Sequence, residues 1–288
     1  MKRLILIISL IFISGCVRHN IHPSNLKDSF VFVNKRVTIN VCGTAENKST
    51  SCKKFLDMGS VGSGAIIHNE RSALENPRTF ILTANHVCET GKMSLESFGP
   101  SALEHIQKNL KLKPPYNLDV KSSMSVKNHF GEEYEVKTAP WVQNAAADTC
   151  VIESSMNAPS LKIGSEPQYG EPLYNIAAPK GIFHPSSSGG GVFFTEGKFN
   201  GNFIMRHGKH FSMYSINAAP GSSGSPVLNK NGEVVGMIHS VDSRFCSRSA
   251  PVCHSVVSYG ATTKQVNETI KAALSAARRN QPIMFDYK

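Results

Sequence analysis

Several kinds of pattern are absent from this 288-residue chain, and each absence excludes a class of protein. No basic segment is interleaved with aromatic residues, which argues against nucleic acid as a partner. The spacing of the seven cysteines fits no zinc site, so we expect no metal and no cofactor. Charged residues make up only 18% of the chain and hydrophobic residues 40%, which is typical of a globular protein and not of a disordered one.

The chain also lacks an apolar run long enough to cross a bilayer comfortably. Its N-terminal apolar run covers residues 4–13, follows the charged start Met1-Lys2-Arg3 and ends in Ile13-Ser14-Gly15-Cys16. This stretch resembles the signal peptide and lipobox of bacterial lipoproteins, in which the cysteine becomes a lipidated N-terminus. The resemblance implies a signal peptide over residues 1–15, a tether over 16–28 and a lipid anchor at Cys16. A secretory signal with an incidental cysteine is the alternative.

Six cysteines remain if Cys16 carries lipid, and an even number in an exported chain indicates disulfides. Six cysteines allow many pairings, so the choice among them stays open. Cys42–Cys52 and Cys246–Cys253 would close short local loops, and Cys88–Cys150 is then left over.

Short strand-like segments separated by turns predict an all-β protein, because they do not alternate with helices. Residues 91–120 break the strand rhythm and are predicted to form a surface insertion with a short helix over 101–108. A helix is expected over 263–280, where Thr262 and Gln265 fit a capping box and apolar residues recur at helical spacing. These patterns fit a β-sandwich or a pair of barrels.

One glycine-rich stretch, Gly221-Ser222-Ser223-Gly224-Ser225-Pro226, precedes a buried hairpin. Glycines allow backbone conformations that other residues disfavour, and they let backbone N–H groups converge on one point, as an oxyanion requires. Ser223 is therefore a candidate nucleophile. It needs a base to remove its proton and an acid to orient that base.

Two upstream segments supply both groups. Phe80-Ile81-Leu82-Thr83-Ala84-Asn85-His86-Val87-Cys88 delivers a histidine at the end of an apolar strand, and Asp148-Thr149-Cys150-Val151-Ile152 places an acid at the start of another. Together with the Ser223 stretch, these segments resemble the three motifs of chymotrypsin/trypsin-like serine proteases, in that family's order of His, Asp and Ser. The flanking segments are most similar to bacterial trypsin-like domains such as those of the HtrA/Deg proteases, here without a PDZ-like domain.

The resemblance implies two six-stranded antiparallel β-barrels followed by a C-terminal helix. The first barrel would cover residues 29–160 and carry His86 and Asp148, and the second would cover 161–262 and carry Ser223. The N–H groups of Gly221 and Ser223 would form the oxyanion hole. Each cysteine of the pair Cys88–Cys150 lies two residues after a triad member, so a bridge there would brace the acid–base pair.

Two departures from the family concern activation and specificity. Ser222 stands where digestive trypsins carry an aspartate that pairs with a newly cut N-terminus, so we expect a protease that is competent once folded. Asn217 stands where trypsins have an acid, which removes support for a preference for Arg or Lys. His239 lies one residue later, relative to Gly236, than the substrate-reading histidine of glutamyl endopeptidases. We therefore name Asn217 and His239 as candidate substrate-pocket residues.

The predicted function is that of a serine endopeptidase that acts on proteins or peptides as a monomer. Its lipid would hold it in the bacterial cell envelope, on the periplasmic or cell-surface side. Two alternatives remain: a catalytically silent lipoprotein that uses the protease fold for binding, and an esterase-like hydrolase that uses the same triad.

Overall fold

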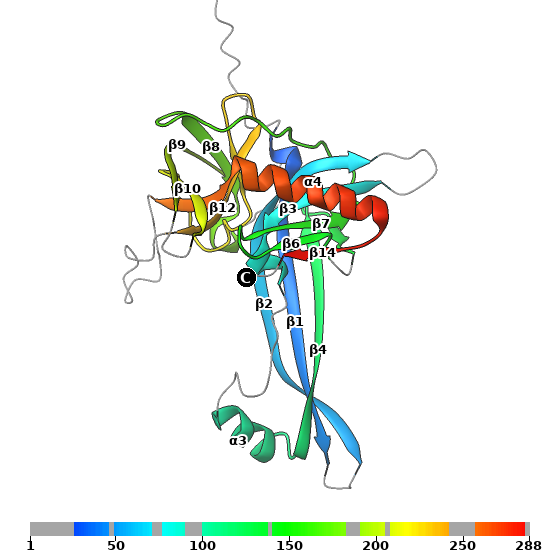
Figure 1. Cartoon of the computed structure of the whole chain (residues 1–288). Coiled ribbons are helices and arrows are strands. Elements are labelled where there is room, and N and C mark those ends of the chain that lie inside the picture. The colour runs from blue at the N-terminus through cyan, green and yellow to red at the C-terminus, as the bar shows by residue number, and fades with distance from the viewer. Residues whose placement is uncertain are drawn as a thin grey trace, which may run out of the picture.

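The computed structural model describes residues 26–45, 49–70, 77–89, 100–137, 140–182, 191–204, 208–241 and 257–285. It is built mainly from strands, which form two sheets beside one long C-terminal helix (Figure 1). The predicted lipobox at Cys16 and the predicted pair Cys246–Cys253 lie outside the described residues. No helix in the described ranges has the length and apolar character needed to cross a bilayer.

The first half of the chain forms an eight-stranded sheet in the order β14-β6-β7-β3-β2-β1-β4-β5. Seven of these strands are antiparallel, whereas β14 comes from the C-terminus and pairs in parallel with β6. The strands are β1 (Phe30–Thr44), β2 (Thr50–Glu70), β3 (Arg78–Ala84), β4 (Lys113–Lys127), β5 (Glu133–Glu135), β6 (Val142–Asn144), β7 (Thr149–Ser154) and β14 (Ile283–Phe285).

The second half is a closed antiparallel barrel of six strands, in the order β10-β13-β12-β11-β8-β9. They are β8 (Pro172–Ala177), β9 (Phe193–Ile204), β10 (His210–Tyr214), β11 (Pro226–Leu228), β12 (Val234–Val241) and β13 (Ser258–Thr262). The all-β prediction with a C-terminal helix is confirmed, and this half is the closed six-stranded barrel that the resemblance implied. The first half is not the six-stranded barrel that the resemblance implied but a sheet of eight strands, one edge of which is the C-terminal β14.

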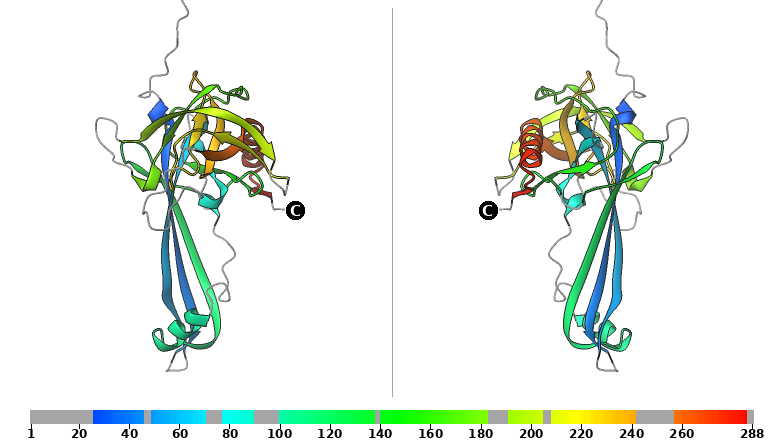
Figure 2. Two further views of the ribbon diagram at one scale, coloured as in Figure 1. Left: turned by 90° about the vertical axis from the view of Figure 1, so that its left-hand side faces the viewer. Right: turned by 90° about the vertical axis from the view of Figure 1, so that its right-hand side faces the viewer.

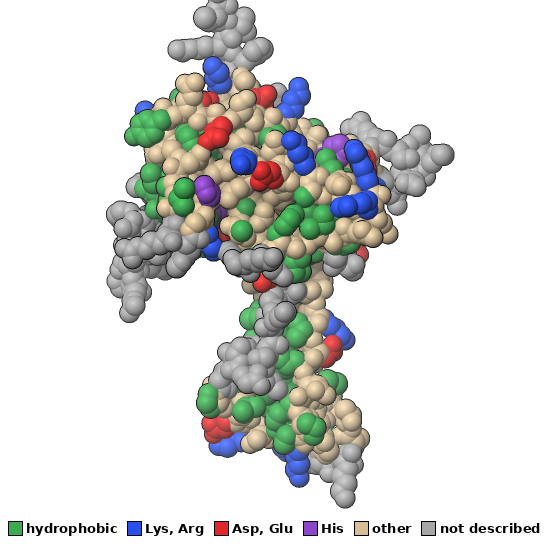
Figure 3. Space-filling model, in the orientation of Figure 1, with side chains coloured by type: hydrophobic (Ala, Val, Ile, Leu, Met, Phe, Trp, Pro, Cys, Tyr) green, Lys and Arg blue, Asp and Glu red, His purple; other side chains and the backbone are tan. Residues whose placement is uncertain are grey.

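A narrow arm projects from the first sheet (Figures 1 and 2). It consists of residues 36–44 of β1, 50–59 of β2 and 113–123 of β4, together with helix α3 (Pro100–Lys108). The disulfide Cys42–Cys52 joins β1 to β2 within the arm, and Val41, Ile106 and Leu112 form a small separate core. Figure 3 shows hydrophobic side chains on the arm's surface as well.

The sequence predicted the helix of the arm but not the arm itself. Residues 30–33 and 37–41 are two apolar segments separated by polar residues, and both belong to one 15-residue strand. Residues 113–120, expected within an irregular insertion, form the outer part of β4 and pair with β1. The polar stretch Asn34-Lys35-Arg36 interrupts the apolar pattern without interrupting the strand, because β1 pairs with a neighbour on each side.

Helix α4 (Thr263–Arg279) packs on the main core. Its apolar face contributes Val266, Ile270 and Ala273, as the helical spacing predicted, and the capping box of Thr262 and Gln265 is present. The hydroxyls of Thr149 in β7 and Thr269 in α4 lie 2.8 Å apart in a buried contact. The helix thereby supports the start of β7, next to Asp148.

A buried carboxylate in the first sheet is surrounded by hydrogen-bond donors. Glu153 in β7 accepts hydrogen bonds from Arg78, Lys137 and the Trp141 indole, and its side chain is 1% exposed. Burial alone would raise the pKa of Glu153, but these hydrogen bonds outweigh burial and lower the pKa from 4.5 to about 2. The carboxylate of Glu153 therefore stabilises the fold at every pH at which it is ionised.

We expect Glu153→Gln to lower the free energy of unfolding by about 3 kcal/mol at neutral pH, because it removes the buried charge shared by Arg78, Lys137 and Trp141 and leaves Arg78 paired only with the more exposed Glu70. Since the folded pKa is depressed, the contribution is complete above pH 4.5 and is lost as pH falls toward 2. Denaturant titrations across this range would measure it. The control, Glu104→Gln, removes the exposed Glu104–Lys108 pair and should change stability by less than ~0.5 kcal/mol. A difference from wild type that did not shrink in acid would contradict the assignment.

Candidate active site

His86 and Asp148 are brought together by the pairing of two strands. β3 ends at Ala84, which lies opposite Thr149, the first residue of the antiparallel β7. The residues just after β3 therefore meet the residue just before β7. His86 follows in the short helix α2 (Asn85–Cys88), whose N–H groups at Asn85 and His86 donate to the Asp148 carbonyl and carboxylate at 3.1 Å and 2.9 Å.

The imidazole of His86 completes this contact. Its Nδ1 lies 2.8 Å from Asp148 Oδ2, so Nδ1–H donates to the carboxylate and Nε2 remains available as a proton acceptor. Asp148 holds both bonds with a φ of 50°, a left-handed conformation that is uncommon for a residue other than glycine. The backbone of Asp148 is therefore held in a costly conformation at this position.

The disulfide Cys88–Cys150 is present, as the resemblance implied. It connects the last residue of α2 to the second residue of β7. The helix that carries His86 is thus fixed covalently to the strand that follows Asp148.

Ser223 lies in a tight turn that only glycines at two positions allow. Gly221 and Gly224 have φ values of 97° and 90°. A Cβ on Gly224 would come within 2.0 Å of the Ser63 carbonyl oxygen, and a Cβ on Gly221 within 2.6 Å of the Ala178 carbonyl oxygen. Both glycines are therefore required by conformation and by space.

The turn leaves two backbone N–H groups available. Those of Ser222, Gly224 and Ser225 donate to carbonyl oxygens within the barrel. Those of Gly221 and Ser223 donate to no residue in the described parts of the chain. Two such available N–H groups, on either side of Ser222, are suited to binding an anionic oxygen.

Ser63 holds this turn against the first sheet, a role that sequence reasoning missed. Its N–H donates to the Ser223 carbonyl at 2.8 Å, and its buried hydroxyl donates to the Gly221 carbonyl at 2.8 Å while accepting from the Ala178 N–H at 3.0 Å. β2 is thereby connected to the Ser223 turn across the two halves. The flanking Gly62 and Gly64 in a buried strand were the available signal for such close backbone contact.

The Ser223 hydroxyl donates to the His239 carbonyl oxygen at 3.3 Å. Among the described residues, no hydrogen bond joins Ser223 to His86. The structure therefore pairs the histidine with the aspartate and places the serine nearby in the turn with its hydroxyl directed elsewhere.

His239 lies beside the pair, with Nδ1 3.9 Å from Asp148 Oδ2 and its side chain 7% exposed. It lines a cavity of about 290 Å³ together with His86, Asp148 and Phe211, and Phe211 contacts its ring edge to face. Burial lowers the pKa of His239 to about 4. Asn217 is exposed and does not line this cavity, so the substrate-pocket assignment of the two residues stays a prediction.

We expect the ring protons of His239 to titrate near pH 4 in an NMR titration of the folded protein. Phe211→Ala should raise its pKa toward 6.5 because it exposes the imidazole to water. Phe199→Ala, which removes a ring of the barrel core beside Tyr214, serves as the control and should leave this pKa unchanged. Titration of His239 near 6.5 in the wild type would contradict the burial described here.

Comparisons with known proteins show the family to which this chain belongs. The family model of the trypsin-like peptidase domain matches residues 62–237, more than half of the chain. Among curated proteins, no match to the chain is found.

Solved structures share the fold at low sequence identity. The HtrA-type protease AlgW with tripeptide is similar over 90% of this chain and 63% of that chain, with a TM-score of 0.54 and 16% identity. A variant of the same protease with decapeptide covers 90% of this chain and 67% of that chain, with a TM-score of 0.55 and 16% identity. This chain thus spans only 61–67% of the length of the matched structures. It belongs to the trypsin-like peptidase domain family and has the fold of a serine endopeptidase.

Proposed function

We propose that this protein hydrolyses peptide bonds through His86, Asp148 and Ser223 by way of an acyl-enzyme. The observation that carries the proposal is the His86–Asp148 pair at 2.8 Å beside a glycine-rich turn, two of whose N–H groups donate to no other described residue. Peptides are the proposed substrates, since the similar HtrA-type structures contain a tripeptide or a decapeptide. We further propose that the protein acts as a monomer.

The first step begins with a rotation of the Ser223 hydroxyl. Rotation about χ1 would move the hydroxyl away from the His239 carbonyl oxygen, so that it would donate to His86 Nε2 instead. Oγ then attacks the substrate carbonyl carbon while Nε2 takes the proton, and Asp148 stabilises the imidazolium through Nδ1–H. His86 returns the proton to the leaving amine as the C–N bond breaks. Water then attacks the acyl-enzyme in the same manner, which regenerates Ser223.

The N–H groups of Gly221 and Ser223 would bind the oxyanion that forms in each attack. Each such donor is worth about 3–4 kcal/mol of transition-state stabilisation in comparable sites. Ser63 supports this role because it fixes the carbonyl groups of Gly221 and Ser223, and with them the orientation of the turn.

A silent binding protein is the second candidate, and one observation favours it. The Ser223 hydroxyl bonds to the His239 carbonyl and not to His86. If that bond persisted in solution, the serine would not be activated.

Labelling with a fluorophosphonate probe distinguishes the two candidates. We expect wild type to be labelled, Ser223→Ala not at all, and His86→Ala at least ~100-fold more slowly, because the base no longer accepts the proton. Ser222→Ala, the neighbouring serine, should still be labelled. Failure of folded, disulfide-intact wild type to react would favour the binding protein.

We also propose that the protein is a lipoprotein of the bacterial cell envelope, anchored through Cys16. The support is the lipobox-like stretch Ile13-Ser14-Gly15-Cys16 after a short apolar run. The anchor would place the peptidase at a membrane surface on the periplasmic or outer side.

Metabolic labelling with an alkyne fatty acid tests the anchor in bacterial cells. We expect label on wild type and on Ser14→Ala, which keeps a small residue before the cysteine, and no label on Cys16→Ala. Equal labelling of the Cys16→Ala protein would exclude this site of lipidation.

A further inference from the structure

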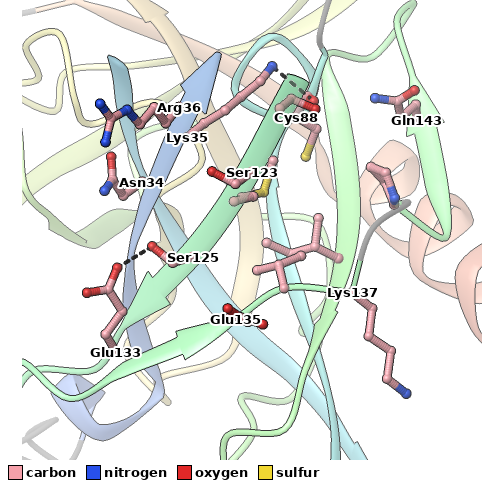
Figure 4. A pocket seen from close by; sticks show the side chains of 15 residues that line it. Asn34, Lys35, Arg36, Cys88, Ser123, Ser125, Glu133, Glu135, Lys137 and Gln143 are labelled. Atoms are coloured by element: carbon pink, nitrogen blue, oxygen red, sulfur yellow. Dashed lines mark hydrogen bonds between the residues drawn. The ribbon is translucent and has the colours of Figure 1, made fainter. Parts of the chain in front are cut away.

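Lys35 is a buried lysine at the root of the arm. It lies in β1 immediately before Arg36, where the arm leaves the body, and it is 4% exposed. Its Nζ donates to the carbonyl oxygen of Cys88 at 3.1 Å (Figure 4) and also to the carbonyl oxygen of Glu89. These two carbonyls end helix α2, which carries His86.

A buried ammonium usually lies against a carboxylate. Within the described ranges, no carboxylate oxygen lies within salt-bridge distance of Lys35. Burial lowers the pKa of Lys35, and the charge of Glu89 opposes that shift. The backbone carbonyls are thus the partners that compensate for removing this charge from water.

The chemistry of a helix end explains why a lysine is suited to this place. The last carbonyls of a helix have no partner within the helix, and they carry the negative end of its dipole. α2 has four residues, too few to hold itself together by its own hydrogen bonds. A cation at its C-terminal end satisfies the orphaned carbonyls and stabilises the turn.

We propose that Lys35 is a positioning residue that holds α2, and with it the His86 imidazole, in the geometry the reaction requires. This inference rests on the proposed peptidase function. Asp148 binds the two N–H groups at the start of α2, and the disulfide Cys88–Cys150 fixes its last side chain. Lys35 adds a restraint on the carbonyls at the end of the helix.

The Lys35 side chain also connects α2 to the arm. Lys35 pairs with Ser60 of β2 and Met124 of β4, so all three strands of the arm meet around it. The next residue, Arg36, makes an ion pair with Asp57 of β2 at 2.5 Å. Any displacement of these strands at their root would move the ammonium relative to the helix that carries His86.

Lys35 lines an open cavity of about 650 Å³ at this root, together with Ser123, Met124 and Gln143 (Figure 4). The cavity has a useful consequence for testing the proposal. Lys35→Ala removes three methylene groups and the ammonium, which together correspond to propylamine. A cavity of this size admits that molecule from solution, so the missing cation can be supplied again.

The test compares Lys35→Ala with Lys121→Ala by the maximal rate of fluorophosphonate labelling. Lys121 lies on β4 in the same arm, and its exposed ammonium lies 3.5 Å from Asp119. We expect Lys35→Ala to lower the maximal rate roughly tenfold, with the half-saturating probe concentration unchanged within about twofold. Propylamine should restore most of the rate, and sodium chloride at equal ionic strength should not. Lys121→Ala should react as wild type does.

Two results would overturn the proposal: an unchanged rate for Lys35→Ala, or a loss that propylamine does not restore and that follows a matching fall in melting temperature. A second measurement separates this proposal from the proposed function. Hydrogen exchange of residues 85–89, in a Ser223→Ala background, should be faster in Lys35→Ala and slowed again by propylamine. If the wild-type protein is never labelled, the proposed peptidase function is wrong. If hydrogen exchange of residues 85–89 is unchanged in Lys35→Ala, Lys35 does not hold α2.

Discussion

The antiparallel pairing of β3 with β7 is the constraint on which the site depends. Ala84 and Thr149 form the last pair of this ladder, so the chain leaves one strand at the point where it enters the other. His86 and Asp148 follow directly from that meeting. The buried apolar residues of both strands, among them Ile81, Leu82 and Ile152, keep the ladder in register because a shift by one residue would expose them.

Polar contacts between buried backbone groups then carry this geometry to the second half of the molecule. Ser63 joins β2 to the turn that holds Ser223, and the glycines of that turn allow the two backbones to approach. Lys35 acts similarly within the first half of the molecule, where it joins β1 to the end of α2. In both cases one side chain satisfies backbone groups of a segment too short to satisfy its own.

The sequence predicted the parts of the site that lie in compact motifs. His86, Asp148 and Ser223 each have a distinctive local context, and the cysteines beside the first two predicted the bridge that the structure contains. Ser63 and Lys35 could not be found in this way, because each acts on residues far along the chain. Lys35 was also hidden by its neighbours, since a polar run within an apolar segment is more often a turn than a fully paired central strand. The parallel β14 has no signal of its own beyond three apolar residues.

The most direct test of the proposed site is a crystal structure of the protein after reaction with a small fluorophosphonate. It tests the claim that elements of both halves converge on one reacting oxygen. We expect phosphorus bonded to Ser223 Oγ, one phosphonyl oxygen accepting from the N–H groups of Gly221 and Ser223, and His86 Nε2 within hydrogen-bond distance of the adduct. Phosphorus on another residue, or an adduct whose oxygen points away from both N–H groups, would contradict that claim.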